Sequence, residues 1–187
     1  MPFTFHPAGL PGLVIIQPRV FPDDRGFFLE SYKESEFRQA GIGVRFVQDN
    51  HSSSVRGVLR GMHYQLPPYA QGKLVGVLEG RVWDVAVDIR PDSPTFRRWL
   101  GIELSAAEHR MFYIPPGFAH GFVTLTDRAQ FYYKCTAEYR RENEAGIRWD
   151  DPTIGIEWPV SEVSVSERDR GLPLFSDARL FPTRGPA

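Results

Sequence analysis

The sequence predicts an all-β fold, a sandwich or barrel of antiparallel strands with a few short helices. Short runs rich in β-branched and aromatic residues follow one another along the chain. Clusters of Gly, Pro, Asp and Ser separate these runs in the way that turns separate strands. Regular short strands of this kind favour a sandwich or a barrel over alternating strand–helix units.

The expected strands lie between residues 12 and 139. In chain order they cover 12–21, 26–32, 44–50, 55–65, 73–80, 81–90, 99–104, 110–115, 120–125 and 129–139. The segment "LEGRV" around Gly80 predicts a hairpin turn. The segment "KESEFRQAG", residues 33–41, predicts a helix of one or two turns that Gly41 ends. The tail "PTRGPA", residues 182–187, is expected to be frayed.

Two of the expected strands alternate along their length. In the first, one face holds Trp83, Val85, Val87 and Ile89, and the other holds Val82, Asp84, Ala86 and Asp88. In the second, Phe131, Tyr133 and Cys135 lie opposite Tyr132 and Lys134. A polar face of this kind inside a barrel would line a ligand-binding mouth.

Length and composition limit the class of protein. A chain of 187 residues with 42% hydrophobic and 24% charged residues suits one domain, residues 1–187. The net charge of −1 gives no sign of a basic surface, so we expect neither nucleic acid nor a membrane as a partner. Cys135 is the only cysteine, which fits a reducing compartment. No signal-like segment and no run of ~18 apolar residues is present, so the expected location is the cytoplasm.

His63, in "RGMHYQLPPYAQGKL", has three possible roles. As a metal ligand it would need partners, and the sequence offers only His120 in "PPGFAH" and a carboxylate such as Glu79 or Asp84. As a core residue it would sit among apolar side chains, yet several polar residues crowd the same segment. No metal is expected, because the ligand set is incomplete.

Proton transfer is the third role. The unperturbed pKa of histidine lies nearest neutrality, and a neighbouring carboxylate can orient the ring. A nearby cation, Arg60 or Lys73, could stabilise an oxyanion. Strict alternation would place Arg60 and His63 on opposite faces of the strand, since they are three positions apart. Either Gly61 marks a bulge that redirects one of them, or one of them does not line the site.

The motifs of the chain resemble those of the dTDP-4-dehydrorhamnose 3,5-epimerase family, in the cupin superfamily. They occur in one order from about Val14 to Asp169 and include "FPDDRGFFLESY", "VQDNHSSSVRGVLRGMHYQLPPYAQGKLV", "IPPGFAHGFVTL", "YYKCTAEY" and "VSERD". The resemblance implies a jelly-roll barrel and a homodimer that exchanges N-terminal β-structure. It also implies that no metal and no organic cofactor takes part.

The family reaction inverts the two carbons beside the 4-keto group of dTDP-4-dehydro-6-deoxy-D-glucose and gives dTDP-4-dehydro-L-rhamnose. The resemblance makes His63 the base, Asp169 the carboxylate that orients it, and Tyr133 the proton donor on the opposite side. Lys73 matches the residue held near the keto oxygen. The hydrogen on carbon beside a ketone becomes acidic only when the enolate oxygen is stabilised.

The resemblance also implies residues that hold the nucleotide sugar. They are Arg25, Glu30, Gln48, Asn50, Arg60, His120, Glu144 and Arg168. Arginine suits the diphosphate because its planar fork gives paired charged hydrogen bonds. Arg168 stands where the family commonly has lysine, which changes the shape of that cation. Asp84 is a candidate to orient His120, and the partner subunit would contribute the segment around Phe27 to Glu30.

Three rival functions remain open at this point. A relative of the same family could epimerise only one carbon, although a tyrosine at position 133 favours the double reaction. A metal-dependent cupin enzyme would need stoichiometric metal. A non-catalytic sugar-nucleotide binding module would exchange no protons with solvent.

Overall fold

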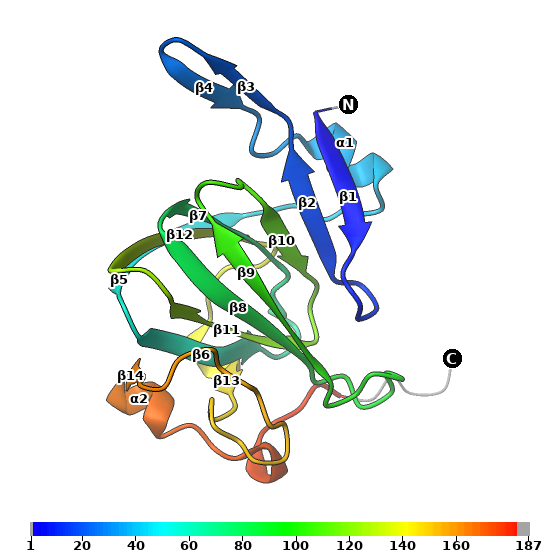
Figure 1. The fold of residues 1–187 in the computed structure, drawn as a ribbon. Coiled ribbons are helices and arrows are strands. Elements are labelled where there is room, and N and C mark those ends of the chain that lie inside the picture. Colours follow the sequence, from blue (N-terminus) through cyan, green and yellow to red (C-terminus); the bar gives the residue numbers. More distant parts are fainter. Residues whose placement is uncertain (1, 183–187) are drawn as a thin grey trace.

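The fold is all-β, as the sequence predicts, and the computed structural model describes residues 2–182 (Figure 1). One sheet has the strand order β1 (Phe3–Pro7), β2 (Val14–Pro18), β10 (Met111–Ile114), β7 (Lys73–Glu79), β12 (Arg128–Cys135) and β5 (Gln48–Val55). The other has the order β13 (Glu144–Gly146), β6 (Val58–Gln65), β11 (Phe118–Thr124), β8 (Arg81–Asp88) and β9 (Trp99–Ser105). All these pairings are antiparallel, and β14 (Ser164–Val165) adds to β6 in parallel.

A two-stranded hairpin stands away from both sheets at the top of Figure 1. It consists of β3 (Val20–Asp23) and β4 (Gly26–Leu29). The helices are short: α1 (Glu34–Gln39), α2 (Glu167–Arg170) and 3-10 turns at Arg141–Asn143 and Phe175–Asp177. No helix within residues 2–182 is long and apolar enough to cross a membrane.

The two faces of β8 serve two different cores, which confirms the alternation read from the sequence. Val82 and Ala86 point between the sheets, where they pack with Phe112 and Phe131. Trp83, Val85, Val87 and Ile89 point the other way, into a cluster with Phe175 of the C-terminal segment. Fully burying a large apolar side chain contributes roughly 1.5–3 kcal/mol, so both clusters add to the stability of the sheet that carries His63.

The hairpin predicted at Gly80 is wrong. Gly80 does form a tight turn with φ of +75°, and a Cβ there would lie 2.1 Å from the carbonyl oxygen of Arg128. However, β7 pairs with β10 and β12, whereas β8 pairs with β9 and β11. The turn therefore carries the chain from one sheet to the other. A left-handed glycine serves a hairpin and a corner equally well, so the local sequence cannot distinguish them.

The predicted helix at 33–41 is confirmed as α1. It buries Phe37 completely, and the rings of Phe3, Phe5 and Tyr32 pack around it. Gly41, with φ of +88°, ends the helix as expected. Strand β1, which is short and is framed by Pro2 and Pro7, was not expected from the sequence, and neither was α2. Of the tail at 182–187, only Pro182 lies within the described residues.

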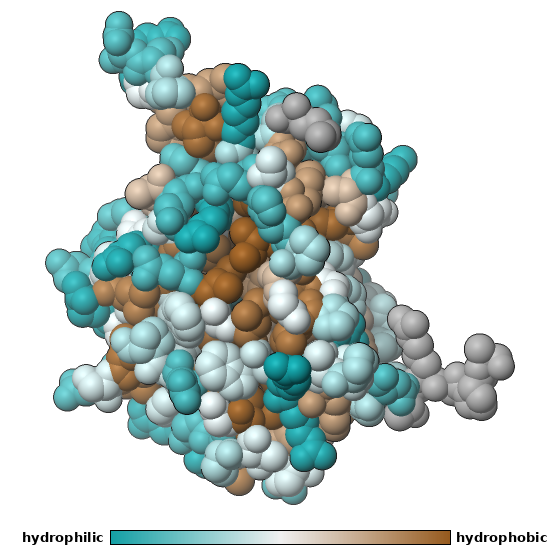
Figure 2. Space-filling model, turned by 45° about the vertical axis from the view of Figure 1, so that its right-hand side comes forward, coloured by the Kyte–Doolittle hydropathy of each residue, from teal (hydrophilic) through white to brown (hydrophobic). Residues whose placement is uncertain are grey.

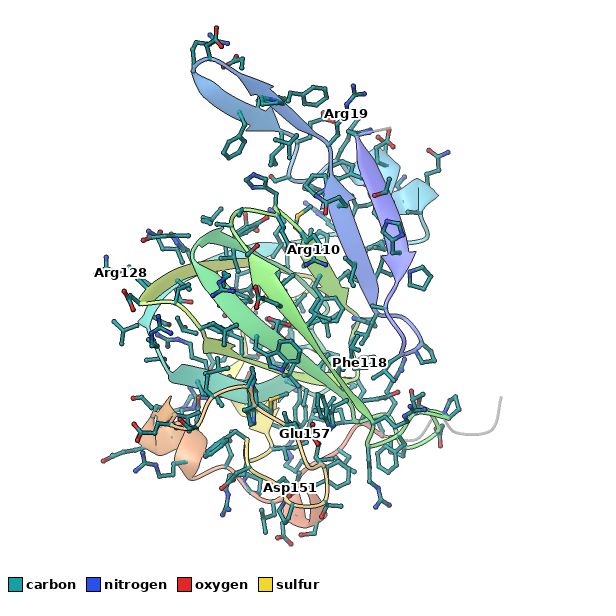
Figure 3. The ribbon with its side chains drawn as sticks, viewed as in Figure 1. Arg19, Arg110, Phe118, Arg128, Asp151 and Glu157 are labelled. Carbon is teal, nitrogen blue, oxygen red and sulfur yellow. The ribbon has the colours of Figure 1, made fainter. Side chains whose placement is uncertain are left out.

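The C-terminal segment is fixed over the outer face of the second sheet. Buried Asp151, labelled in Figure 3, accepts hydrogen bonds from the backbone N–H groups of Thr153, Ile154 and Phe175 at 2.7–2.9 Å. The chain then returns along β14 to α2, which lies beside β6 (Figure 1). This path brings residues from the end of the chain next to the strand that carries His63.

Candidate active site

A cavity of about 490 Å³ opens between the two sheets, and both sheets and α2 line it. It gathers every predicted site residue except Arg25 and Glu30. These are Gln48, Asn50, Arg60, His63, Lys73, His120, Tyr133, Glu144, Arg168 and Asp169. The residues come from segments far apart in the sequence, so the strand pairing of the barrel creates the site.

His63 and Asp169 form a hydrogen-bonded pair. Nε2 of His63 lies 2.8 Å from Oδ1 of Asp169, and the second carboxylate oxygen accepts from the backbone N–H of Gly61 at 3.2 Å. Burial works against ionisation of Asp169, but the hydrogen bonds from His63 and Gly61 outweigh it, and the pKa lies below its usual value. An ionised Asp169 accepts a hydrogen bond from the N–H at Nε2 of His63. The other ring nitrogen, Nδ1, then carries no proton and can take one up.

A bulge at Gly61 brings Arg60 and His63 to the same cavity. In the pairing of β11 with β6, His120 lies opposite His63 and Phe122 lies opposite Arg60. Two steps along β11 thus match three steps along β6, and the extra residue changes which face the next side chain takes. Of the two possibilities that the sequence left open, the bulge is confirmed, and both side chains line the cavity.

Lys73 and Tyr133 lie together on the other side of the cavity. Nζ of Lys73 is 3.5 Å from the carbonyl oxygen of His63 and 6.0 Å from the centre of the Tyr133 ring. Burial lowers the pKa of Lys73, and the charges of Cys135, Asp84 and Glu144 act against that shift. Burial raises the pKa of Tyr133, so its hydroxyl keeps its proton at neutral pH. The cavity therefore holds an imidazole, a protonated phenol and a buried amine.

A second histidine–carboxylate pair lies deeper in the barrel. Nε2 of His120 is 2.9 Å from Oδ2 of Asp84, as proposed from the sequence, and the ring of Phe131 stacks on the imidazole at 6.1 Å between centres. Burial lowers the pKa of His120 despite the nearby carboxylate. The imidazole is therefore neutral at neutral pH.

One wall of the cavity is a chain of amides from β5. Gln48 donates to the side-chain oxygen of Asn50 at 3.1 Å and accepts from the backbone N–H of Tyr139 at 2.8 Å. The guanidinium of Arg60 is held by the hydroxyl of Ser54 at 3.0 Å. These contacts fix donors and acceptors along the wall before any ligand arrives.

Charged and aromatic side chains meet at the mouth of the cavity. The carboxylate of Glu144 accepts from the Tyr139 hydroxyl at 2.7 Å and forms an ion pair with Arg168. Tyr139 and Ser166 also line the cavity, although neither was expected there from the sequence. Ser52 and Gln65 line it too, and both lie in the polar segments that carry Gln48 and His63. Tyr139 ends the aromatic run at 129–139 and is followed directly by a polar turn. An aromatic residue at such a border was the only feature of the sequence that could have indicated a place at the mouth of the cavity.

The structure does not bring Arg25 or Glu30 to this cavity. Arg25 lies at the tip of the β3–β4 hairpin, where its guanidinium pairs with Asp23 at 2.6 Å and its side chain is 89% exposed. Glu30 follows β4 directly. Figure 3 shows the hairpin extending away from the barrel, beyond the labelled Arg19, although the ring of Phe27 lies 4.5 Å from that of His109 between centres.

Among residues 2–182 there is no cluster of three or more His, Cys, Asp or Glu side chains that could hold a metal ion. The two histidines of the cavity each bind a different carboxylate. This arrangement suits the transfer of protons to and from carbon next to a carbonyl, because each of the required groups has a fixed place.

Fold and cavity define an isomerase of the jelly-roll, cupin-like class. The family model described as dTDP-4-dehydrorhamnose 3,5-epimerase matches residues 7–177. The chain belongs to the dTDP-4-dehydrorhamnose 3,5-epimerase family, and it is an epimerase.

Individual relatives agree with the family assignment. A dTDP-4-dehydrorhamnose 3,5-epimerase of Shigella flexneri is 53% identical over 173 residues, which cover 92% of this chain and 96% of the relative. One of Methanothermobacter thermautotrophicus is 51% identical over 90% of this chain and 92% of its own. A crystal structure of the Legionella pneumophila dTDP-6-deoxy-D-glucose-3,5-epimerase in complex with dTDP-4-keto-L-rhamnose is 48% identical, with a TM-score of 0.89 and 92% coverage of both chains.

Proposed function

We propose that the cavity converts dTDP-4-dehydro-6-deoxy-D-glucose into dTDP-4-dehydro-L-rhamnose by moving protons at the two carbons beside the keto group. One observation carries this proposal: the His63–Asp169 pair, at 2.8 Å, shares a single cavity with Tyr133 and Lys73. The family and the bound product of the Legionella relative support the substrate class.

In the proposed mechanism, Nδ1 of His63 removes the proton from carbon, and the electron pair of the C–H bond moves into the enolate. Asp169 stabilises the imidazolium that forms, because it is ionised and accepts from Nε2. Lys73 donates to the enolate oxygen. Tyr133 then gives its hydroxyl proton to the opposite face of the same carbon, and the enolate electrons form the new C–H bond. Solvent restores the tyrosine proton, and His63 releases its proton.

The thymidine diphosphate is proposed to lie along the polar wall and the mouth. Gln48 and Asn50 offer both donors and acceptors there, as a base needs. Arg60 and Arg168 supply cations for the diphosphate, and each guanidinium can donate two parallel hydrogen bonds. His120 and Glu144 complete the proposed binding set.

We propose that the enzyme is a homodimer in which the β3–β4 hairpin of one subunit reaches the cavity of the other. The hairpin exposes Phe27 and Phe28, at 59% and 66%, and Figure 2 shows brown apolar side chains below its teal polar tip at the top of the view. Within the described chain β5 pairs only with β12, so its other edge is available. Arg25 and Glu30 of the partner would then join Gln48 and Asn50.

The outer face of the first sheet supports the same arrangement. A second cavity of about 820 Å³ lies between this face and the hairpin, lined by Phe27, Leu29, Leu78 and Tyr132 among others. Arg110, labelled in Figure 3, also lines it. An apolar surface of this kind favours burial against a second copy of the chain. Sedimentation at micromolar concentration tests the proposal, and a fully active monomer would rule it out.

We further propose that residues 1–187 act as one domain in the cytoplasm. The segment after β12 has no sheet of its own, because β13 and β14 both pair with β6. Cys135 is buried and free, which is compatible with a reducing compartment.

The decisive experiment follows dTDP-4-keto-6-deoxyglucose by NMR in heavy water. We expect deuterium at both carbons together with the inverted product. Deuterium at one carbon alone would indicate a single-carbon epimerase, and no incorporation would indicate a binding module. Elemental analysis of the same sample is the matched control, because activity that follows stoichiometric metal would support a metal-dependent enzyme.

A further inference from the structure

Strands β6 and β11 lie in close contact where each has a glycine. A Cβ on Gly61 would lie 2.6 Å from the Cα of Gly121 and 3.2 Å from the carbonyl oxygen of His120. A Cβ on Gly121 would lie 3.0 Å from the Cα of Gly61 and 2.8 Å from the carbonyl oxygen of Arg60. The atom nearest to a Cβ on Gly121 is Sδ of Met62, at 2.7 Å, which a rotamer change could move. The other obstacles are backbone atoms, which no side-chain rotation could relieve. Both positions therefore require glycine for this separation of the strands.

The same glycine pair lies at the bulge. The register between β6 and β11 shifts between the His63–His120 pair and the Arg60–Phe122 pair, and Gly61 and Gly121 occupy the interval. Gly61 has φ of +147°, a conformation that side-chain-bearing residues rarely adopt. At the bulge the backbone N–H of Gly61 points toward α2 rather than forming a hydrogen bond with a neighbouring strand.

That N–H donates to Asp169. The distance from Gly61 N to Oδ2 of Asp169 is 3.2 Å, and the bond is buried. Asp169 has two further contacts: its Oδ1 bonds Nε2 of His63, and its own N–H donates to the hydroxyl of Ser166, which caps α2. One oxygen of the carboxylate is therefore fixed by the backbone of the bulge, and the other oxygen binds the imidazole of His63.

We propose that Gly61 and Gly121 form a positioning element for the His63–Asp169 pair. The close approach of the two glycines sets the bulge, the bulge aims the Gly61 N–H at Oδ2, and the anchored carboxylate fixes the plane of the His63 ring. The inference rests on the proposed role of His63 as the base. Both glycines act through Asp169 and touch no substrate.

The alternative is that the glycines matter only for packing. Gly101 on β9 provides a matched comparison in the same sheet, because a Cβ there would meet the ring of Trp83 at 2.6 Å. Gly101 makes no contact with the dyad. A Gly101→Ala substitution therefore crowds the same sheet, here against a side-chain ring, without touching Asp169.

The experiment compares Gly121→Ala, Gly101→Ala and His63→Asn with the wild type. For each folded variant we would measure kcat and KM. For the wild type and the two glycine variants we would also measure the low-field proton NMR signal of the hydrogen bond between His63 and Asp169. We expect Gly121→Ala to lower kcat on the order of 10- to 100-fold, as small misplacements of catalytic groups do, with KM changed less than about threefold. The low-field signal should shift or broaden. Gly101→Ala should keep both kcat and the signal.

The outcomes separate this inference from the proposed function. A folded His63→Asn protein that retains exchange would remove the proposed role of His63 as the base, on which this inference rests. If His63→Asn is inactive while Gly121→Ala keeps the wild-type kcat and NMR signal, the positioning role alone is wrong. Equal losses of kcat in Gly121→Ala and Gly101→Ala would also overturn it, because packing would then explain both.

A second measurement applies even if Gly121→Ala does not fold. In Asp169→Asn the acceptor at Oδ2 loses its charge, so the amide proton of Gly61 should move upfield relative to the wild type, while that of Gly101 should stay in place. A Gly61 amide that does not respond would contradict the anchor between the bulge and the carboxylate.

Discussion

The barrel contains two histidine–carboxylate pairs of nearly the same geometry on neighbouring strands. Nε2 of His63 lies 2.8 Å from Asp169, Nε2 of His120 lies 2.9 Å from Asp84, and the two histidines face each other in the register of β6 and β11. Their surroundings differ. The side chain of His63 is 30% exposed to the cavity, whereas those of His120 and Asp84 are 7% and 0% exposed.

We infer from this difference that burial, rather than hydrogen-bond geometry, distinguishes the proposed base His63 from His120. A base must reach its substrate and carry a positive charge during turnover, which access to the cavity allows for His63. His120 lies deeper, and burial lowers its pKa, with the charges of Lys73 and His63 adding to that shift. A histidine that stays neutral can fix the orientation of a neighbour, but it is poorly suited to accept a proton from carbon.

The largest expected effect separates the two histidines directly. His63→Asn should lower exchange at both carbons by roughly 10²–10⁴-fold, the usual cost of losing a positioned base. His120→Asn should act mainly on KM, since that side chain is proposed to contact the substrate without moving a proton. Deuterium incorporation and steady-state kinetics on both folded variants measure this. Exchange near the wild-type rate in His63→Asn would reverse the assignment.

The next effect concerns the acid on the opposite side. Tyr133→Phe keeps the ring that packs near Phe131 and removes only the hydroxyl. His63 should still form the enolate, but protons would return mainly from the histidine side. We expect deuterium to enter the sugar with little inverted product, so the ratio of exchange to inversion should rise at each carbon. If exchange and inversion fall equally, a different group is the acid.

The two carboxylates should respond differently to the same substitution. Asp169→Asn should lower kcat by about 10²-fold with little change in nucleotide affinity, because an amide cannot stabilise the developing imidazolium. Asp84→Asn should lower kcat less than tenfold. It should lower the stability by about 1–3 kcal/mol, because its NH₂ group would take the place of Oδ1, which has no hydrogen-bond partner in the described chain, and its two donors would stay unpaired in a buried site. Kinetics and urea unfolding of both variants provide the comparison. A larger kcat loss in Asp84→Asn would refute the distinction between the pairs.

The smallest effect is the pH dependence of stability. Because the folded pKa of Asp169 lies below its unfolded value of about 3.9, its ionisation stabilises the fold above that pH. The contribution is lost as pH falls through the lower, folded pKa. The stability difference between wild type and Asp169→Asn should therefore shrink as the pH falls below about 4. Urea unfolding at several pH values tests this, and a difference that grows in acid would show that the sign is wrong.

Sequence patterns predicted the strands well, because alternation in β8 and β12 directly reflects which face is buried. They could not predict the pairing of strands, as the corner at Gly80 shows, since pairing is decided by contacts distant in the chain. The partnership of His63 with Asp169 came from family resemblance alone. No pattern of neighbouring residues predicts that a residue on β6 contacts one on α2. For Gly61, the sequence left two possibilities open, of which a bulge was one. Tyr139 was missed because its role arises from contacts with Gln48 and Glu144 across the mouth.

The distance along the chain between His63 and Asp169, 106 positions, has a consequence for folding. Every strand of the two sheets except β14 can pair while residues 164–170 are still undocked, and at that stage His63, the proposed base, has no carboxylate to orient it. Recovery of turnover during refolding should therefore lag behind recovery of the β-sheet circular dichroism. A variant in which α2 cannot dock should accordingly lose turnover while most of the barrel still forms.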